Sequence, residues 1–228
     1  MSFLYFCTIN PSRSSASAGA VIKYLDEPIP YSLNLINNLA KVYRFRYTFD
    51  MSNYDAIYEY AADNYGLITS AKAKAIGIPN IELVKLAHRG RLIRTGQGVY
   101  RVTHYIPTTL DKYAEAVALV GEGAYIFSES VLAMHGLALV NPAVIYVATS
   151  NRVRKTLPKH IMMVYRKSAE QVVHYEGIPS QSVTNAFLEC RNAIMAERLL
   201  IAIDEAEQQG LISNKEAIII RKVLLHEQ

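Results

Sequence analysis

The chain has 228 residues and a mass of 25.5 kDa, which allows one large domain or two small ones. Its hydrophobic content of 51% is ample for packed cores, yet no apolar run approaches the ~20 residues that a membrane-spanning helix needs. The two cysteines, Cys7 and Cys190, are too few for a metal cluster and favour a reducing, cytoplasmic compartment.

Positive charge is concentrated in the first half of the chain. Residues 1–50 carry five Lys or Arg against three Asp or Glu, and residues 51–106 carry seven against four. Residues 107–228 carry twelve against thirteen. The basic excess indicates a polyanionic partner, although a solvated surface with ordinary scatter of charge is an open alternative.

Residues 1–50 form an N-terminal extension whose status the sequence leaves open. The opening SFLYFCTI is apolar but short, and no Lys or Arg precedes it, so we expect no signal peptide. Pro11–Ala20 is rich in small residues and resembles a linker. Either translation begins naturally at Met51 and the first fifty residues are non-native or accessory, or they form an ordinary structured arm.

Clear sequence signals for helices begin just after Met51. Ser52 and Asp55 have the spacing of a capping box, and the apolar stripe that follows predicts a helix ended by Asn64 and Gly66. After a brief extended GLIT, Thr69 can cap a short helix at Ser70–Ala75.

A third helix follows the tight turn at Ile76–Ile78. It is expected to start at Pro79 or Asn80 and to reach Arg89, with Gly90 as its left-handed stop. Two short strands then flank Thr95–Gly98, where glycines permit the turn of a hairpin. Helix, short helix, turn, helix and hairpin is the order of a winged helix-turn-helix, and we assign residues 51–106 to such a DNA-binding domain.

Residues 107–228 are expected to form a second, α+β domain. Thr108 and Asp111 have capping-box spacing and predict a helix to about Val120, and a further helix is expected near Ser128–Leu137. The expected strands are Val144–Thr149, Ile161–Arg166 and Val172–Ile178. The expected C-terminal helices are Val183–Ile194, Glu197–Gln208 ended by Gly210, and a last helix capped by Ser213 and Glu216.

The third helix has two contrasting faces on a helical wheel. Leu83, Leu86 and Ala87 fall on the side that would pack inward. The opposite side mixes charged and branched apolar residues, which suits base edges and thymine methyl groups in a major groove. Alternatively, the apolar members of this face bury against residues 1–50 or the second domain. The predicted DNA contacts on this helix are Asn80, Ile81, Glu82, Val84, Lys85, His88 and Arg89.

The hairpin adds a second group of predicted DNA contacts. Arg94 and Arg101 could neutralise phosphates, while Thr95 and Gln97 could donate hydrogen bonds at the tip. Such contacts position a protein on DNA without reading its sequence. A plain hairpin with solvated arginines is the alternative.

The stretch GLITSAKAKAIGIPNIELVKLAHRGRLIRTGQGVYRV, residues 66–102, resembles the winged helix of AbiEi-type antitoxins of bacterial type IV toxin–antitoxin systems. Tyr125–Thr149 resembles the start of that family's second domain, with Ser128 and His135-Gly136-Leu137 in place, although Val131-Leu132-Ala133 departs from the usual order. Residues 1–50 have no counterpart in the pattern.

The resemblance implies two roles. The winged helix would repress its own operon by binding inverted repeats in operator DNA. Residues 107–228 would counteract a co-encoded nucleotidyltransferase-like toxin without forming a stable complex with it. The alternative is a winged-helix regulator whose second domain senses a ligand.

Enzyme chemistry is disfavoured by the residue pattern. No Gly-x-Ser-x-Gly surrounds a serine, so we expect Ser128 to cap a helix and His135 to satisfy helix-end carbonyls. The six histidines lack zinc-helix spacing, and we expect no catalytic residues, no metal and no cofactor. The basic stretch Asn151–His160 is either a solvated loop or a contact for nucleic acid or an acidic toxin surface.

Overall fold

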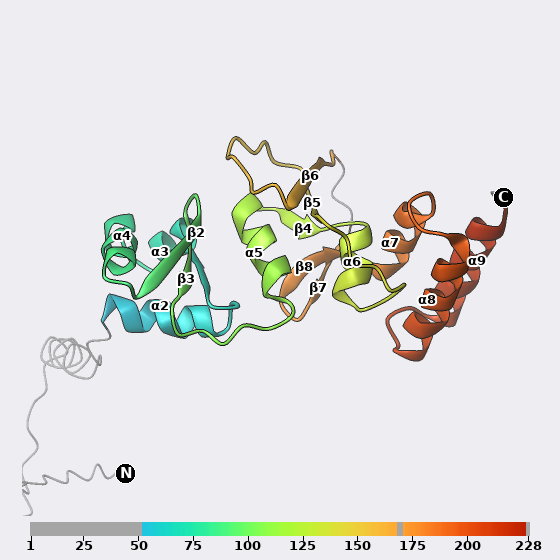
Figure 1. Cartoon of the computed structure of the whole chain (residues 1–228), viewed down its shortest axis with the longest axis horizontal. Coiled ribbons are helices and arrows are strands. Elements are labelled where there is room, and N and C mark those ends of the chain that lie inside the picture. The colour runs from blue at the N-terminus through green and yellow to red at the C-terminus, as the bar shows by residue number, and fades with distance from the viewer. Residues whose placement is uncertain (1–51, 168–170, 227–228) are drawn as a thin grey trace, which may run out of the picture. The chain divides into compact units, whose positions relative to one another are not determined.

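The computed structural model of the protein describes residues 52–167 and 171–226 (Figure 1). The expectations for residues 1–50 lie outside this part of the chain. The fold is α+β, with helices packed on a three-stranded sheet and on a five-stranded sheet. No helix in the described part is long and apolar enough to cross a membrane.

Residues 52–102 form a winged helix-turn-helix, as the sequence predicts. The Ser52 hydroxyl accepts from the Asp55 N–H while the Asp55 carboxylate accepts from the Ser52 N–H, so the predicted capping box is present. The Thr69 hydroxyl likewise caps the next helix by accepting from the Lys72 N–H at 3.2 Å. The elements are α2 (Asn53–Ala62), β1 (Leu67–Thr69), α3 (Ser70–Ala75), α4 (Asn80–His88), β2 (Leu92–Gly96) and β3 (Val99–Val102).

The winged helix has a core of its own. In the order β1-β3-β2, both neighbours run antiparallel to the central strand β3. Ile57 of α2, Leu83 of α4 and Ile68 of β1 are fully buried in this core. Gly77, at a φ of +84°, makes the turn between α3 and α4 that lets both helices pack on it.

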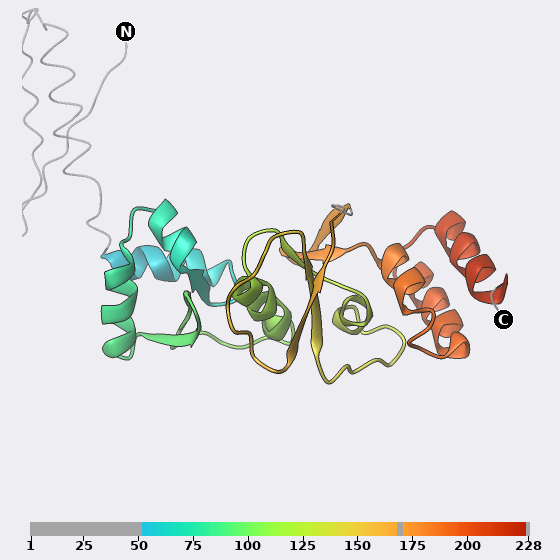
Figure 2. The same cartoon turned by 90° about the horizontal axis from the view of Figure 1, so that it is seen from above.

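The larger sheet has the strand order β6-β5-β4-β8-β7. Helices α5 and α6 pack against its central strands, and α7, α8 and α9 follow as a helical end (Figures 1 and 2). The elements are α5 (Asp111–Val120), β4 (Ala124–Ile126), α6 (Glu129–Met134), β5 (Ile145–Thr149), β6 (Ile161–Tyr165), β7 (Val172–Tyr175), β8 (Ile178–Gln181), α7 (Val183–Cys190), α8 (Ala196–Gln208) and α9 (Asn214–His226).

Several predicted bounds in residues 107–228 need correction. The strand expected at Val172–Ile178 is the first arm of a hairpin, which turns at Glu176 and Gly177 and continues as β8. The sequence also gave no signal for β4, because three residues are too few to establish a period. Helix α5 begins at Asp111, later than expected, and only half of the predicted capping box forms. The Thr108 N–H and hydroxyl both donate to the Asp111 carboxylate, while no side chain caps the first N–H groups of the helix.

The two sheets are joined by direct contacts. Leu67 and Val99 of the winged helix belong to the larger core that surrounds α5 and the five-stranded sheet. Gly96 lies so close to α5 that an added Cβ would stand 2.2 Å from Leu119 Cδ2. The Tyr65 hydroxyl donates to the Glu176 carbonyl oxygen at 2.5 Å. The domain boundary at Pro107 stays a prediction, but residues on either side of it share apolar contacts.

Candidate nucleic-acid interface

Helix α4 presents the face that the helical wheel predicts. Leu83 is 0% exposed and Leu86 is 6% exposed, whereas Ile81 is 57% and Val84 is 51% exposed. The alternative in which Ile81 and Val84 bury against residues 107–228 is therefore not what the structure shows. The other side chains on this outward face are also exposed: Asn80, Lys85, His88 and Arg89.

An ion pair spans part of this outward face. Lys85 Nζ lies 2.7 Å from Glu82 Oε1, and the Glu82 side chain is 24% exposed. Exposed ion pairs of this kind contribute about 0–1 kcal/mol to stability, so separating Lys85 from Glu82 costs little free energy. Lys85 also lies in the last turn of α4, where cations are favoured by the helix dipole.

The β2–β3 hairpin, here called the wing, is tied down at its tip. The Ser70 N–H donates to the Gly98 carbonyl oxygen at 2.8 Å, and Gly98 has a φ of +74°. Gln97 is exposed, whereas the partly buried Thr95 hydroxyl lies 3.5 Å from the Val99 carbonyl oxygen. Arg94 is exposed, and its Nε donates to the Gly96 carbonyl oxygen at 3.3 Å.

Arg101 lies differently from the sequence expectation of an open phosphate contact. Its Nη2 is 3.0 Å from Glu115 Oε2 and its Nη1 is 3.6 Å from Asp111 Oδ2, and its side chain is 20% exposed. The reason is the period of β3: Tyr100 faces the winged-helix core, so Val99 and Arg101 face the opposite side, which α5 covers.

Two cations that the predicted site omits lie over aromatic rings of α2. Lys72 Nζ of α3 lies 5.0 Å from the centre of the Tyr60 ring, and the Arg91 guanidinium carbon lies 4.8 Å from that of Tyr54. Both cationic residues are exposed. Their position beside α2 depends on how three helices pack together, and no local sequence motif predicts that packing.

The residues considered for enzyme chemistry are placed unfavourably for it. Ser128 stands at the N-terminal position of α6 but makes no side-chain cap, and its hydroxyl lies 3.5 Å from Cys190 Sγ. Burial raises the pKa of the Cys190 thiol to about 11, which keeps it protonated and poorly nucleophilic. Burial also lowers the pKa of His135 to about 4, and the centre of its ring lies 4.0 Å from that of Tyr175.

The described residues contain no group of three or more His, Cys, Asp or Glu side chains that could hold a metal ion. His135 ends α6, and its backbone N–H completes the helix by donating to the Val131 carbonyl oxygen. The expectation that its imidazole serves the helix-end carbonyls is not what the structure shows, since the ring lies against Tyr175.

The fold of residues 52–102 thus defines a winged-helix protein in which one face of α4 is exposed. Residues 55–103 match the family model described as "Transcriptional regulator, AbiEi antitoxin". This match confirms the resemblance to AbiEi-type antitoxins, a regulatory family, for the part of the chain that carries the helix-turn-helix and the wing. No curated protein matches the chain.

Proposed function

We propose that the protein is a DNA-binding antitoxin that represses its own toxin–antitoxin operon through the winged helix. Residues 107–228 then counteract a nucleotidyltransferase-like toxin. The observation that supports DNA binding best is the outward face of α4, where exposed Ile81 and Val84 stand among cations. Apolar side chains that are half exposed on a helix beside charged groups fit a major groove better than bulk solvent.

Each side chain on α4 has a partner in this arrangement. Lys85 donates to guanine acceptors or to a phosphate, and Glu82 accepts from a cytosine amino group. Ile81 and Val84 contact thymine methyl groups, while Asn80 at the start of the helix bonds an adenine or a phosphate. His88 and Arg89 flank the groove. Because Glu82 and Lys85 are already paired, they would approach adjacent bases together.

The wing contributes contacts to the DNA backbone. Arg94 and Gln97 are exposed and can reach phosphates beside the groove that α4 enters, and Thr95 supports the tip. We omit Arg101 from this set because its guanidinium is engaged by Asp111 and Glu115. These contacts position the protein, while α4 supplies the sequence preference.

Gel shifts with the upstream region of the operon, which we expect to hold inverted repeats, test DNA binding. If two copies neutralise ~6–8 phosphates, the affinity falls by roughly 10³-fold or more between roughly 50 and 200 mM salt. Binding that does not respond to salt contradicts the proposal. An unrelated sequence of the same length serves as the control for specificity.

The antitoxin role is tested with the full-length chain carrying both Lys85→Ala and Arg94→Ala. We expect this variant to lose repression of a promoter reporter and to keep rescuing cells from the neighbouring toxin. No stable complex with the toxin is expected. Loss of rescue at normal protein levels would mean that neutralisation needs DNA binding. Full-length variants are preferable to a fragment starting near Thr108, because Leu67 and Val99 belong to the larger core.

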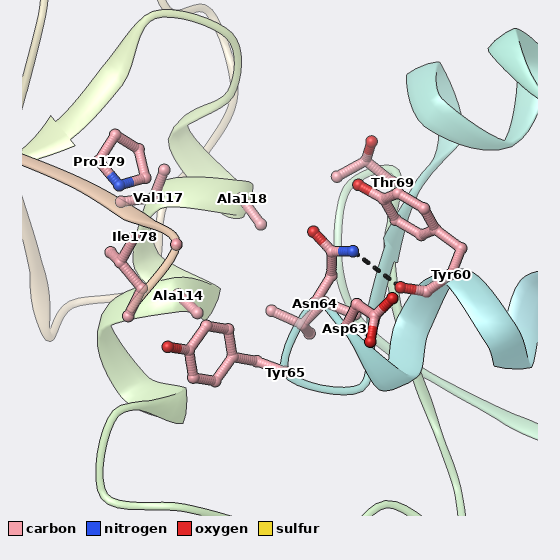
Figure 3. Close-up of a pocket in the computed structure, with 12 residues that line it drawn as sticks. Tyr60, Asp63, Asn64, Tyr65, Thr69, Ala114, Val117, Ala118, Ile178 and Pro179 are labelled. Atoms are coloured by element: carbon pink, nitrogen blue, oxygen red, sulfur yellow. Dashed lines mark hydrogen bonds between the residues drawn. The ribbon is translucent and has the colours of Figure 1, made fainter. Parts of the chain in front are cut away.

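The ligand-sensing alternative is favoured by one observation. A hollow of about 190 Å³ lies where α2 and β1 meet α5 and β8, with Val117 and Pro179 on one side and Asn64 on the other (Figure 3). The Asn64 amide donates to the Tyr60 carbonyl oxygen at 2.8 Å. Val117→Phe would fill the hollow. A regulator that needs no ligand keeps its reporter response in this variant, whereas a ligand-sensing one changes it.

A further inference from the structure

Strand β6 is an edge of the five-stranded sheet, and β5 is the only strand in the described part of the chain that pairs with it. Figure 1 shows it at the margin of this sheet. Met162 is 49% exposed, Met163 is 36% exposed and Tyr165 is 57% exposed. Because consecutive residues of a strand point to opposite faces, apolar side chains are open on both faces of this edge.

The backbone of β6 also offers hydrogen-bonding groups at this edge. The Ile145 N–H donates to the His160 carbonyl oxygen at 2.7 Å, and the Arg166 N–H donates to the Thr149 carbonyl oxygen at 3.0 Å. Residues 160 and 166 therefore turn their backbone groups toward β5. With a period of two, Met163 and Tyr165 turn theirs away from β5, toward the open edge.

Open edges are usually blunted by a charge or a proline within the strand. Residues 161–165, Ile-Met-Met-Val-Tyr, contain neither. The charges stand outside the strand instead, with Lys159 before it and Arg166 and Lys167 after it. The pattern thus combines an apolar, hydrogen-bonding centre with positive charge at both ends.

The positive ends select the kind of strand that fits. Pairing β6 antiparallel with a second copy of itself about Met163 would place Lys159 opposite Lys167, and like charges in opposed positions destabilise a sheet. Arg166 already pairs with Glu189 at 2.7 Å, whereas Lys159 and Lys167 are exposed. A strand with acidic residues at its ends would place opposite charges at both positions.

We propose that β6 is a docking edge that accepts an extended segment of a partner protein as a sixth strand, and that this segment carries acidic residues at both ends. Main-chain hydrogen bonds to Met163 would supply affinity, and Lys159 and Lys167 would supply selectivity. The proposal does not depend on DNA binding, since it uses no residue of the winged helix.

A pair of synthetic peptides tests the proposal with the full-length protein. The probe is acetyl-Glu-Asp-Val-Thr-Val-Thr-Val-Asp-Glu-amide, and the control replaces its four acidic residues with lysine. Fluorescence anisotropy is expected to show binding of the acidic peptide at least about tenfold tighter than that of the control, with the difference reduced by salt. Failure of the acidic peptide to bind, or equal binding of the two peptides, overturns the proposal.

Two kinds of variant separate the backbone from the charges. Met163→Pro removes an N–H that does not serve the β5 pairing and is expected to abolish peptide binding, whereas Met163→Thr keeps that N–H and retains binding. The double variant Lys159→Glu with Lys167→Glu is expected to bind the lysine peptide more tightly than the acidic one. This variant tests the proposal even if the proline variant fails to fold. Dimerisation of the unmodified protein through β6, seen by sedimentation and abolished by Met163→Pro, would assign the edge to a second copy and refute the proposal.

Discussion

Helix α4 and strand β3 lie in the same winged helix and both carry basic residues, but the surroundings of these residues differ. Lys85 of α4 is half exposed and pairs only with its neighbour Glu82 within the described residues. Arg101 of β3 reaches across to Asp111 and Glu115 of α5. A cation in a winged-helix fold is therefore not by itself a candidate DNA contact. Whether another element of the protein covers the side chain decides whether it is free to contact a partner.

The largest expected effect concerns the buried face of α4. Leu83→Ala removes a side chain that is 0% exposed and is expected to lower the free energy of unfolding by about 2–5 kcal/mol. Val84→Ala, on the outward face, should change it by no more than about 0.5 kcal/mol. Urea denaturation of both variants measures the difference, and equal losses would mean that α4 is oriented otherwise.

A second test concerns His135, partly buried beside Tyr175. Its pKa is lowered to about 4, so the unfolded chain takes up the proton first as the pH falls. Stability is expected to decrease from about pH 7 down to about pH 4, by up to about 3 kcal/mol. Denaturation curves at both ends of this range measure the loss. His135→Asn should flatten this dependence, while His88→Asn, at an exposed position, should leave it in place.

A covered cation and an exposed cation can also be compared within the wing, by the effect of their removal on stability. Arg101→Ala leaves Asp111, which is 5% exposed, with an unpaired charge and is expected to lower the free energy of unfolding by about 2–3 kcal/mol. Arg94→Ala, an exposed change in the same hairpin, should have little effect. Thermal denaturation compares the two. If Arg101→Ala were as stable as Arg94→Ala, the ion pairs of Arg101 with α5 would make no net contribution to the free energy of unfolding.

The smallest expected effects are in DNA preference. Lys85→Ala and Glu82→Ala should each alter preference at defined base pairs by about 1–3 kcal/mol, whereas Arg94→Ala should weaken all sequences alike and reduce the salt slope by about one. Competition gel shifts with singly substituted operators measure both. Altered base preference in the Arg94 variant, with none in the helix variants, would reverse the proposed docking geometry.

Local signals predicted the winged helix closely. Ser52, Thr69 and Gly90 mark ends of helices through hydrogen bonds or backbone conformation that involve near neighbours in the chain, and each behaves as the sequence indicates. The wheel likewise placed Leu83 inside and Ile81 outside. Such features depend only on residues a few positions apart, so the sequence displays them directly.

Features that depend on residues far apart in the chain could not be predicted from the sequence. The ion pairs of Arg101 with α5 and the hairpin formed by β7 and β8 depend on which elements meet in space. Ser128 was expected to cap a helix by its residue type, but it adopts a φ of +53° and its N–H donates to the Gln181 side chain, fifty-three positions away. The sequence carries no local sign of that partner.

The apolar contact of Val99 with the larger core has a consequence for cooperativity. Because β3 is the central strand of the small sheet, each of its hydrogen-bonded amides exchanges with solvent only when the neighbouring strand that accepts its N–H separates from it. Val99 also packs in the core around α5, so opening of that core withdraws support from β3. The wing and the five-stranded sheet should therefore open as one cooperative unit, with similar hydrogen-exchange protection at Val99 and Val147.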